Sequence, residues 1–591
     1  MSVDVFIVAH FDSGKLCMTT SRPQARSVGG VEYLFTNQIA DIRLPNREIK
    51  PLSDSVSDQK VSVDYFDKSL SPGLALNNGS RFQGRPVQVF VFDDSGSELL
   101  AFEGEIDSFG YDIEECKASF TASSQRSSTK TLFPPGSLLE EGRFVERRTL
   151  DTGEYAQTSY NQQIQYLVPL MEFNSAYGTP SSPIQNFTFR VTPISVAPGV
   201  VANPDGSYLF FDDRATDLAV PVIYGTNSNV ALNILGHYRV DNGSDYVKVY
   251  ICIVASHRVI GDPAFSSGSN PFAAVIKYNN ISIPSSVGGV DTDRLNSEFS
   301  YITVPVLYSD ADYEDLQPLY PSNFDIYQSY ISSIVGKPSV DGSPISGMYD
   351  VVQDMWLSYG GGRASQVDWK SSSQSRPSLN ALEVSAVFNT RAENQTLLDI
   401  LSQRLQSQFP VSFSFPLGKI AWQGLFFRAP SSSPDPIKTI TLGQNALSRG
   451  GVSQTGISDI VNNLKVSFGI NGNSGEDTES ILLDSHSSEI AKASEDRWGK
   501  SDLSEMRVQD SSFVDTVSLI ANNRLLKSAG VRFEVSYTLS DLSFVSLPFM
   551  SIISVTDDQC AFEDEPFYFL GISWEDTLEV FSVKLLSVKM I

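Results

Sequence analysis

The sequence predicts a mainly β, multidomain fold built from small β-barrel or sandwich modules with a few short helices. Its 591 residues include 36 Phe and 23 Tyr, which favour strands, and recurrent Gly and Pro, which favour turns. Hydrophobic residues make up 41% and charged residues 19%, a balance typical of globular structure rather than disorder. At about 150 residues per domain, the length predicts roughly four domains.

Residues 1–135 are predicted to form an N-terminal β-barrel. Strands are expected at Val3–His10, at Val87–Val91 and at Leu99–Ile106. From Cys116 to Ala122 apolar and polar residues alternate, which is the period of a half-buried strand. Several short antiparallel strands separated by turns indicate a small barrel or sandwich.

The centre of the chain is predicted to contain a connector and a β-rich domain. Residues 136–215 are polar with Gly, Pro and Ser stretches, so we expect an extended connector with some β-structure. A middle domain is predicted for 216–375, with a strong strand at Val247–Ala255 and a helix at 346–359. One face of that helix is apolar: Met348, Val351, Val352, Met355 and Tyr359.

Residues 376–430 are predicted to hold a helix followed by a strand pair. The helix is expected at 395–408, where Leu397, Leu401 and Leu405 recur at four-residue spacing. The strand pair is expected within 411–428.

Residues 431–591 are predicted to form a C-terminal β-barrel with a helix at 511–528. Ser512 and Asp515 have the spacing of a capping box at the start of that helix. Its apolar face is predicted to contain Phe513, Val517, Ile520, Ala521 and Leu525. A half-buried strand follows, with apolar Val531, Phe533, Val535 and Tyr537 alternating with polar Arg532, Glu534 and Ser536.

The charge excludes two classes of partner. With 43 Lys and Arg against 69 Asp and Glu, the formal net charge is −26, so the surface repels nucleic acids and anionic lipid.

The best apolar run, Val247–Ala255, is far shorter than a membrane span. The first fifteen residues lack the basic start and the cleavage site of a signal peptide, so we expect a soluble chain without an export signal.

The residue types that commonly carry catalysis or bind metals are few and scattered. The four histidines, His10, His237, His257 and His486, show no metal-ligand spacing, and Cys17, Cys116, Cys252 and Cys560 form no CxxC pair. The sequence therefore predicts no catalytic, cofactor-binding or metal-binding residues and no cofactor.

Three short patterns bear a partial likeness to chemical motifs. Gly360–Arg363 lacks the spacing of a phosphate loop and is interpreted as a helix stop and hinge. Asp310–Asp315 lacks the glycine and the bidentate glutamate of a calcium loop, which favours a solvated acidic loop. Ser485 and His486 are adjacent and point apart, so His486 is interpreted as a loop residue.

The sequence contains a series of short motifs: Gly30–Tyr33, Gln83–Val87, Phe102–Ile106, Val220–Gly225, Met348–Gly361, Val367–Trp369, Asp459–Val466, Arg497–Gly499 and Phe513–Leu526. In this order along most of the chain, the motifs resemble those of baseplate hub and tail-tip attachment proteins of long-tailed bacteriophages and gene-transfer particles. Each motif alone is short and degenerate, so the resemblance depends on the order of the motifs along the chain. The chain departs from it at Leu547–Ser551, where such proteins tend to have Gly-Asp, and the connector has no counterpart.

The resemblance implies a structural virion protein without enzymatic activity, located at the tail tip or baseplate and made in the host cytoplasm. Such hubs are homotrimers in which two barrel domains of each subunit form a ring against the sixfold tail tube. The implied partners are tail-tube and other distal tail proteins, a central threefold spike or fibre, and a tape measure protein. DNA would pass through the ring without specific binding, and no membrane-spanning segment is implied.

One other function class remains open at the level of sequence. The Ser-, Tyr- and Asn-rich strands also suit a virion-borne glycan-binding or glycan-cleaving β-protein, because glycosidases need only two carboxylates placed in space. A hub fused to a peptidoglycan hydrolase is disfavoured, because the sequence has no compact Cys/His or zinc pattern.

Overall fold

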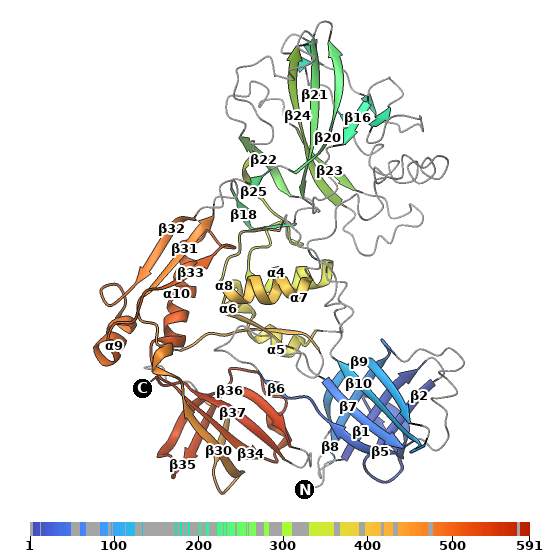
Figure 1. Cartoon of the computed structure of the whole chain (residues 1–591), viewed down its shortest axis with the longest axis vertical. Helices are drawn as coiled ribbons and strands as arrows, with labels where there is room; N and C mark the ends of the chain where they lie inside the picture. The colour runs from blue at the N-terminus through green and yellow to red at the C-terminus, as the bar shows by residue number, and fades with distance from the viewer. Residues whose placement is uncertain are drawn as a thin grey trace.

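The structure is a computed structural model of the chain. It describes residues 4–123 apart from 12–13, 49–59, 67–82, 93–95, 97 and 113, then Phe133, and strands with a few neighbouring residues between 172 and 309. It also describes residues 330–590 apart from 360–363, 365–366, 389–395, 415–418, 429–434, 471–476 and 576–579. The fold is mainly β with several separate sheets, which confirms the predicted fold class (Figure 1).

The N-terminal unit is a nine-stranded sheet in the order β3-β4-β2-β1-β8-β9-β10-β7-β5. Its strands are β1 Asp4–Phe11, β2 Gly14–Thr19, β3 Gln24–Val28, β4 Val31–Asn37, β5 Ile39–Arg43, β7 Lys60–Phe66, β8 Pro86–Phe92, β9 Glu98–Asp112 and β10 Lys117–Ser123. The predicted strands at Val3–His10, Val87–Val91 and Leu99–Ile106 are confirmed as β1, β8 and part of β9.

Both faces of β1 are buried, which explains why its sequence is apolar without alternation. Val5 and Ile7 face a core shared with Tyr65. Phe6 faces a second core with Phe35, and their ring centroids lie 4.8 Å apart. The β3–β4 hairpin therefore covers one side of the sheet while the other side closes on β7 and β10.

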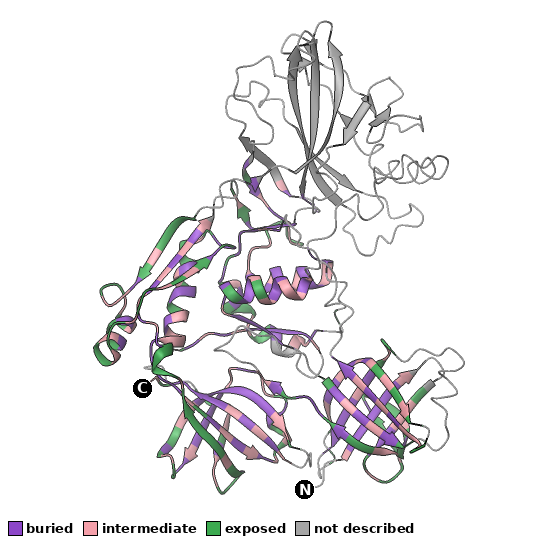
Figure 2. Cartoon of the chain, viewed as in Figure 1, coloured by how far each residue is buried: buried purple, intermediate pink, exposed green. Residues whose placement is uncertain are grey.

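The C-terminal unit is a sheet in the order β29-β35-β36-β37-β34-β30. Its strands are β29 Lys438–Thr441, β30 Ala446–Gln454, β34 Phe533–Leu539, β35 Ile552–Asp557, β36 Phe562–Trp574 and β37 Phe581–Ser587. Strand β30 lies at one edge and is exposed along most of its length (Figure 2). A two-residue strand from the N-terminal half, β6 Arg47–Glu48, pairs with β36.

A central unit of short helices lies between the two β units and the middle sheet (Figure 1). Helix α4 Met348–Asp354 continues as the π-helix η6 Met355–Tyr359, followed by α5 Trp369–Gln374, α6 Arg376–Asn380 and β26 Ala386–Phe388. Next come α7 Leu397–Asp399, the π-helix η8 Ile400–Leu405, α8 Gln406–Gln408, β27 Val411–Ser414 and β28 Ala421–Gly424. The five apolar residues predicted on helix 346–359, and the three leucines predicted on helix 395–408, are all buried.

The range 431–591 also contains a separate α/β unit that the sequence did not predict. It comprises β31 Leu464–Ile470, β32 Asp477–Leu483, α9 Glu489–Trp498, β33 Ser504–Val508 and α10 Val514–Ser528. Its buried side chains, Val517 and Ile520 of α10 among them, share one core with the central helices. Leu526, also on α10, is partly buried and packs against residues of the C-terminal sheet. The predicted domain 431–591, a C-terminal barrel that includes this helix, stays a prediction.

Two details of the C-terminal prediction are wrong. Helix α10 begins at Val514, and Ser512 does not cap it, because its hydroxyl and its N–H bond the Ser385 hydroxyl instead. Arg532, predicted on the polar side of the strand, is 1% exposed. Its two terminal guanidinium nitrogens donate to the carbonyl oxygens of Leu526, Ser587 and Val588, which provide hydrogen-bond partners for them inside the protein.

The middle region contributes a six-stranded sheet in the order β15-β16-β20-β21-β24-β23. Its strands are β15 Val200–Ala202, β16 Tyr208–Phe211, β20 Asn233–Asn242, β21 Asp245–Ala255, β23 Lys277–Ser282 and β24 Glu298–Ser309. The predicted strand at Val247–Ala255 is confirmed as part of β21.

Shorter strands complete the middle region. A second sheet contains β18 Thr226–Asn227, β19 Val230–Ala231, β22 Ile260–Ser266 and β25 Tyr330–Val335, and β17 Val222–Tyr224 pairs with β26 of the central unit. The predicted connector holds the small pairs of β11 Glu172–Phe173 with β14 Phe187–Thr188 and of β12 Gly178–Thr179 with β13 Ser182–Pro183.

Candidate functional site

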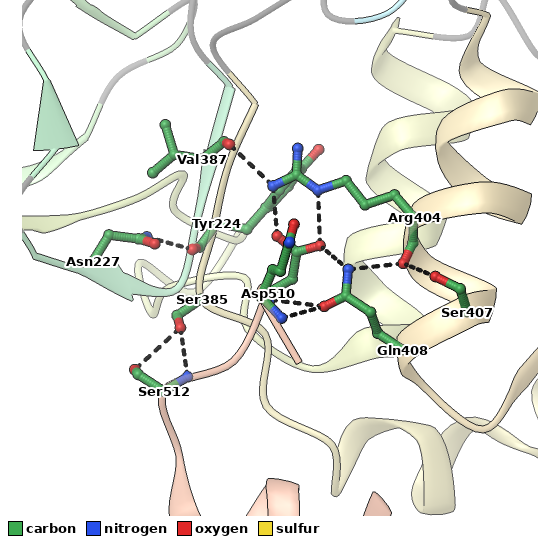
Figure 3. Close-up of polar contacts among 10 residues, drawn as sticks. Tyr224, Asn227, Ser385, Val387, Arg404, Ser407, Gln408, Asp510 and Ser512 are labelled. Atoms are coloured by element: carbon green, nitrogen blue, oxygen red, sulfur yellow. Dashed lines mark hydrogen bonds and ion pairs between the residues drawn. The ribbon is translucent and has the colours of Figure 1, made fainter. Parts of the chain in front are cut away.

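The most distinctive sites in the described part of the chain are buried polar contacts at the junctions between units. Asp510, 1% exposed, accepts hydrogen bonds from Arg404 Nε at 2.8 Å and from Arg404 Nη2 at 2.5 Å. Its Oδ2 also accepts from Gln408 Nε2 at 3.0 Å, and Arg404 Nη2 donates to Val387 O at 3.2 Å (Figure 3). A bidentate arginine–carboxylate pair is geometrically demanding, so it holds its two elements in one register.

This network joins three segments that lie far apart in the sequence. Arg404 comes from η8, Val387 from β26, and Asp510 from the segment between β33 and α10. The side-chain oxygen of Gln408 accepts the backbone N–H groups of Gln509 and Asp510. The central helices and the α/β unit are therefore connected by polar contacts as well as by their shared apolar core.

A second junction, the neck, connects the middle sheets to the central unit through residues 222–228 and 335–345. Tyr224 Oη donates to Asp354 Oδ2 at 2.8 Å, and Lys337 Nζ donates to Asp354 Oδ1 at 2.8 Å. Burial, followed by the nearby Asp354 carboxylate, raises the pKa of Tyr224 well above its usual value. Tyr224 therefore stays a neutral donor at all ordinary pH values.

The neck also explains a glycine at the end of the Val220–Gly225 motif. Gly225 has φ +65°, and a Cβ there would lie 2.0 Å from Val384 O. Only glycine allows this backbone approach without a shift of the chain.

A third junction, the arm, is formed by residues 44–48 and connects the two β units. The arm adds β6 to the edge of β36, with Arg47 opposite Ile572 and Glu48 opposite Gly571. Arg47 is 3% exposed; its Nη1 donates to Val545 O at 2.5 Å and its guanidinium lies 4.5 Å from the Phe549 ring centroid. Burial lowers the pKa of Arg47 to about 10, so the side chain remains a cation at neutral pH.

Two further side-chain hydrogen bonds hold the residues on either side of Arg47. Ser573 Oγ donates to Asn46 Oδ1 at 2.9 Å, and Lys584 Nζ donates to Glu48 Oε2 at 2.6 Å. Both donors lie on the C-terminal sheet, so three consecutive residues of the arm, Asn46 to Glu48, are held by the opposite end of the chain.

A fourth polar cluster lies inside the C-terminal unit, beside edge strand β30. Asp557 Oδ2 accepts from Arg449 Nη1 and from Tyr537 Oη, both at 2.9 Å. Arg449 Nη1 also lies 2.6 Å from Cys560 Sγ. Burial alone would raise the pKa of Asp557, but the hydrogen bonds from Tyr537 and Arg449 outweigh it, so the pKa is lowered.

Acidification is expected to weaken the attachment of β30 through Asp557. A carboxyl group whose pKa is lower in the folded state than its unfolded value of about 3.9 stabilises the protein above that value, and the stabilisation is lost as pH falls through the folded pKa. Between about pH 5 and pH 3, thermal melts of the wild-type chain should lose stability more steeply than those of Asp557→Asn. Equal pH slopes for the two proteins would contradict this role of Asp557.

Two of the histidines, His257 and His486, occupy different environments in the described part of the chain. His257 is 2% exposed and its Nε2 accepts the Ile223 N–H at 3.0 Å, which is a structural role beside the neck. His486 lies in a turn, as predicted, where its N–H donates to Asp484 Oδ1. In the described part of the chain, no group of three His, Cys, Asp or Glu residues could hold a metal ion. The Asp310–Asp315 and Gly360–Arg363 patterns lie outside the described residues.

The described helices include none that is long and apolar enough to cross a membrane.

The sequence signals that could have indicated the junctions were the motifs themselves. The described residues of the Val220–Gly225 motif, Val222 to Gly225, belong to the neck, and the Met348–Gly361 motif contains Asp354. Arg497–Gly499 is joined to Asp459–Val466 through Asn462 Nδ2, which donates to Gly499 O at 2.8 Å. The arm carried no such signal.

Known structures with a similar chain trace include a virion protein and several tail proteins. A protein of the virion of a native gene transfer agent particle is 10% identical, with a TM-score of 0.38 over 63% of this chain and 84% of that one. The 43 kDa tail protein of prophage MuSo2 from Shewanella oneidensis is 8% identical, with a TM-score of 0.33 over 100% and 98% of the two chains. A tail protein from Neisseria meningitidis MC58 is 8% identical, with a TM-score of 0.32 over 99% and 97%.

No protein-family profile matches the sequence, and no curated protein matches it. Likenesses at 8–10% identity and TM-scores of 0.38 or less assign no activity to this chain.

Proposed function

We propose that the chain is a structural protein of a virion tail, a homotrimeric hub at the tail tip or baseplate. In this proposal it joins the sixfold tail tube to a threefold central spike or fibre and forms part of the DNA exit channel. The observation that carries the proposal is the arm. By pairing β6 with β36, the arm fixes the N-terminal and C-terminal β units side by side in one subunit (Figure 1).

A fixed pair of β units is what a threefold-to-sixfold adaptor requires. Three copies of a chain with two such units present six to the tube, and the angle between the units must be the same in every copy. Strand pairing and a buried arginine set that angle more firmly than a flexible linker does. The middle sheet lies at the far end of the molecule from both β units, where it is placed to project away from such a ring (Figure 1).

Charge supports passage of DNA through the proposed ring. A net charge of −26 gives a surface that repels phosphate, so DNA would move through without adhering. The proposed neighbours are tail-tube and distal tail proteins, the spike or fibre, and a tape measure protein. The proposal includes no enzymatic step.

The mass of the purified chain in solution and its position in the assembled particle test this proposal. We expect a species of three times the 64.8 kDa chain mass, and threefold density for this chain at the tail tip with acidic residues on the inner wall. A stable monomer that releases reducing sugar from bacterial surface polysaccharide would overturn the hub in favour of a depolymerase. A neutral or basic inner wall would overturn the proposed charge mechanism.

A further inference from the structure

A small cavity lies where helix α10 meets the end of helix α8 and strands β27 and β33. Its volume is about 50 Å³. Since one water molecule needs about 10–15 Å³ on this measure, the cavity has room for about four heavy atoms, the size of a leucine side chain. The apolar lining is Phe409, Pro410, Val411, Leu425, Phe427, Met506 and Ile520.

One stripe of α10 supplies the other side of the cavity. Ile520, Asn523, Arg524 and Lys527 line it at spacings of three and four residues, which places them on one face of the helix. Two of these are cations, and the lining includes no Asp or Glu. In a chain of net charge −26, such a lining is a local exception.

Most of the polar groups around the cavity are already used by the protein. Asn523 accepts the Phe427 N–H and donates to Leu425 O. Both ends of the Gln408 amide are engaged in the network around Asp510. What remains is a set of donors: the Arg524 guanidinium and the Gln406 amide nitrogen donate to no described residue, while Gln406 Oε1 accepts the Phe413 N–H.

We propose that this cavity binds a segment of a partner polypeptide in which an aliphatic side chain stands next to a carboxylate. The apolar lining takes the side chain, and the Arg524 guanidinium binds the carboxylate oxygens. Lys527 in the last turn complements the helix dipole, but that role does not explain why the apolar recess lies beside Arg524. The inference holds independently of the proposed hub.

The test uses two small probes and the full chain. N-acetyl-L-leucine carries the aliphatic side chain and the carboxylate, while N-acetyl-L-leucinamide carries the same side chain without the charge. At about 0.3 kcal/mol per heavy atom, the acid should bind with a dissociation constant on the order of 1 mM, measured by ligand-observed NMR titration. We expect the amide to bind at least about tenfold more weakly, a difference of about 1.4 kcal/mol.

Matched variants separate the site from non-specific attraction. Arg524→Gln should reduce binding of the acid to the level of the amide, and Arg524→Lys should keep most of it. The control is Arg43→Gln, which removes an equal charge from a side chain that is 80% exposed in the N-terminal unit. Equal binding of the acid and the amide, unchanged binding in Arg524→Gln, or no binding of the acid at 10 times the expected constant would each overturn the proposal.

Discussion

Replacement of Asp510 with alanine is expected to destabilise the junction between the central helices and the α/β unit by about 3–5 kcal/mol. The reason is that Arg404 and Gln408 would lose the buried carboxylate that accepts three of their hydrogen bonds. An uncompensated cation in a largely buried position costs more than the pair gains. Hydrogen exchange of peptides from η8 and β33 measures the effect, since a chain of several units opens locally before it unfolds globally.

Two comparisons make the Asp510 experiment decisive. Asp477 pairs with Arg507 at 2.6 Å, but their side chains are 29% and 42% exposed, so Asp477→Ala should cost no more than about 1 kcal/mol. The double variant Arg404→Met with Asp510→Ala has no unpaired guanidinium at this junction. We therefore expect the double variant to be more stable than Asp510→Ala alone. An Asp510→Ala effect as small as that of Asp477→Ala would contradict the role given to this network.

The helices that the sequence predicted in the central unit are ones in which burial follows a local period. The helix at 346–359 and the helix at 395–408 place their apolar residues on one face, and each of those residues is buried. Their backbones nevertheless contain π-helical turns at η6 and η8, which side-chain periodicity does not reveal. Hydrophobic spacing therefore locates a helix without specifying its hydrogen-bond pattern.

The sequence-based predictions that were wrong failed because the deciding contacts are tertiary. Ser512 has the residue type of a helix cap, but Ser385, 127 residues earlier, takes its hydrogen bonds. Arg532 looks like a solvent-facing residue of a strand because its partners are carbonyl oxygens, which have no sequence signature. Helix α9 has only Ala491 and Ser494 buried, so it shows no apolar stripe to predict it.

The arm shows most clearly what local sequence patterns cannot predict. A strand of two residues has no period, and its partner β36 lies more than 500 residues later in the chain. Arg47 looks like any surface cation until Val545 O and the Phe549 ring are brought beside it. The junctions that support the proposed function are therefore products of the fold, and only the neck had a motif that indicated it.

Replacement of Gly571 with alanine is expected to detach the arm and separate the two β units. Gly571 has φ +147°, and a Cβ there would lie 2.0 Å from Arg47 O and 2.7 Å from Glu48 Cα. A backbone contact at that distance cannot be relieved by a side-chain rotation, so β6 must leave β36. Arg47 would then lose its bond to Val545 O. Hydrogen exchange and limited proteolysis at residues 44–48 should show the released arm.

The matched control for Gly571→Ala is Gly443→Ala in the same C-terminal unit. Gly443 has φ +81° with nothing within 4 Å of the added Cβ, so that change tests backbone strain alone, about 1–2 kcal/mol. Protection of residues 44–48 should be lost only in Gly571→Ala. If the proposed ring needs a fixed angle between the β units, the same variant should also fail to form trimers while each unit stays folded. An arm that stays protected in Gly571→Ala would show that strand pairing does not hold the two units together.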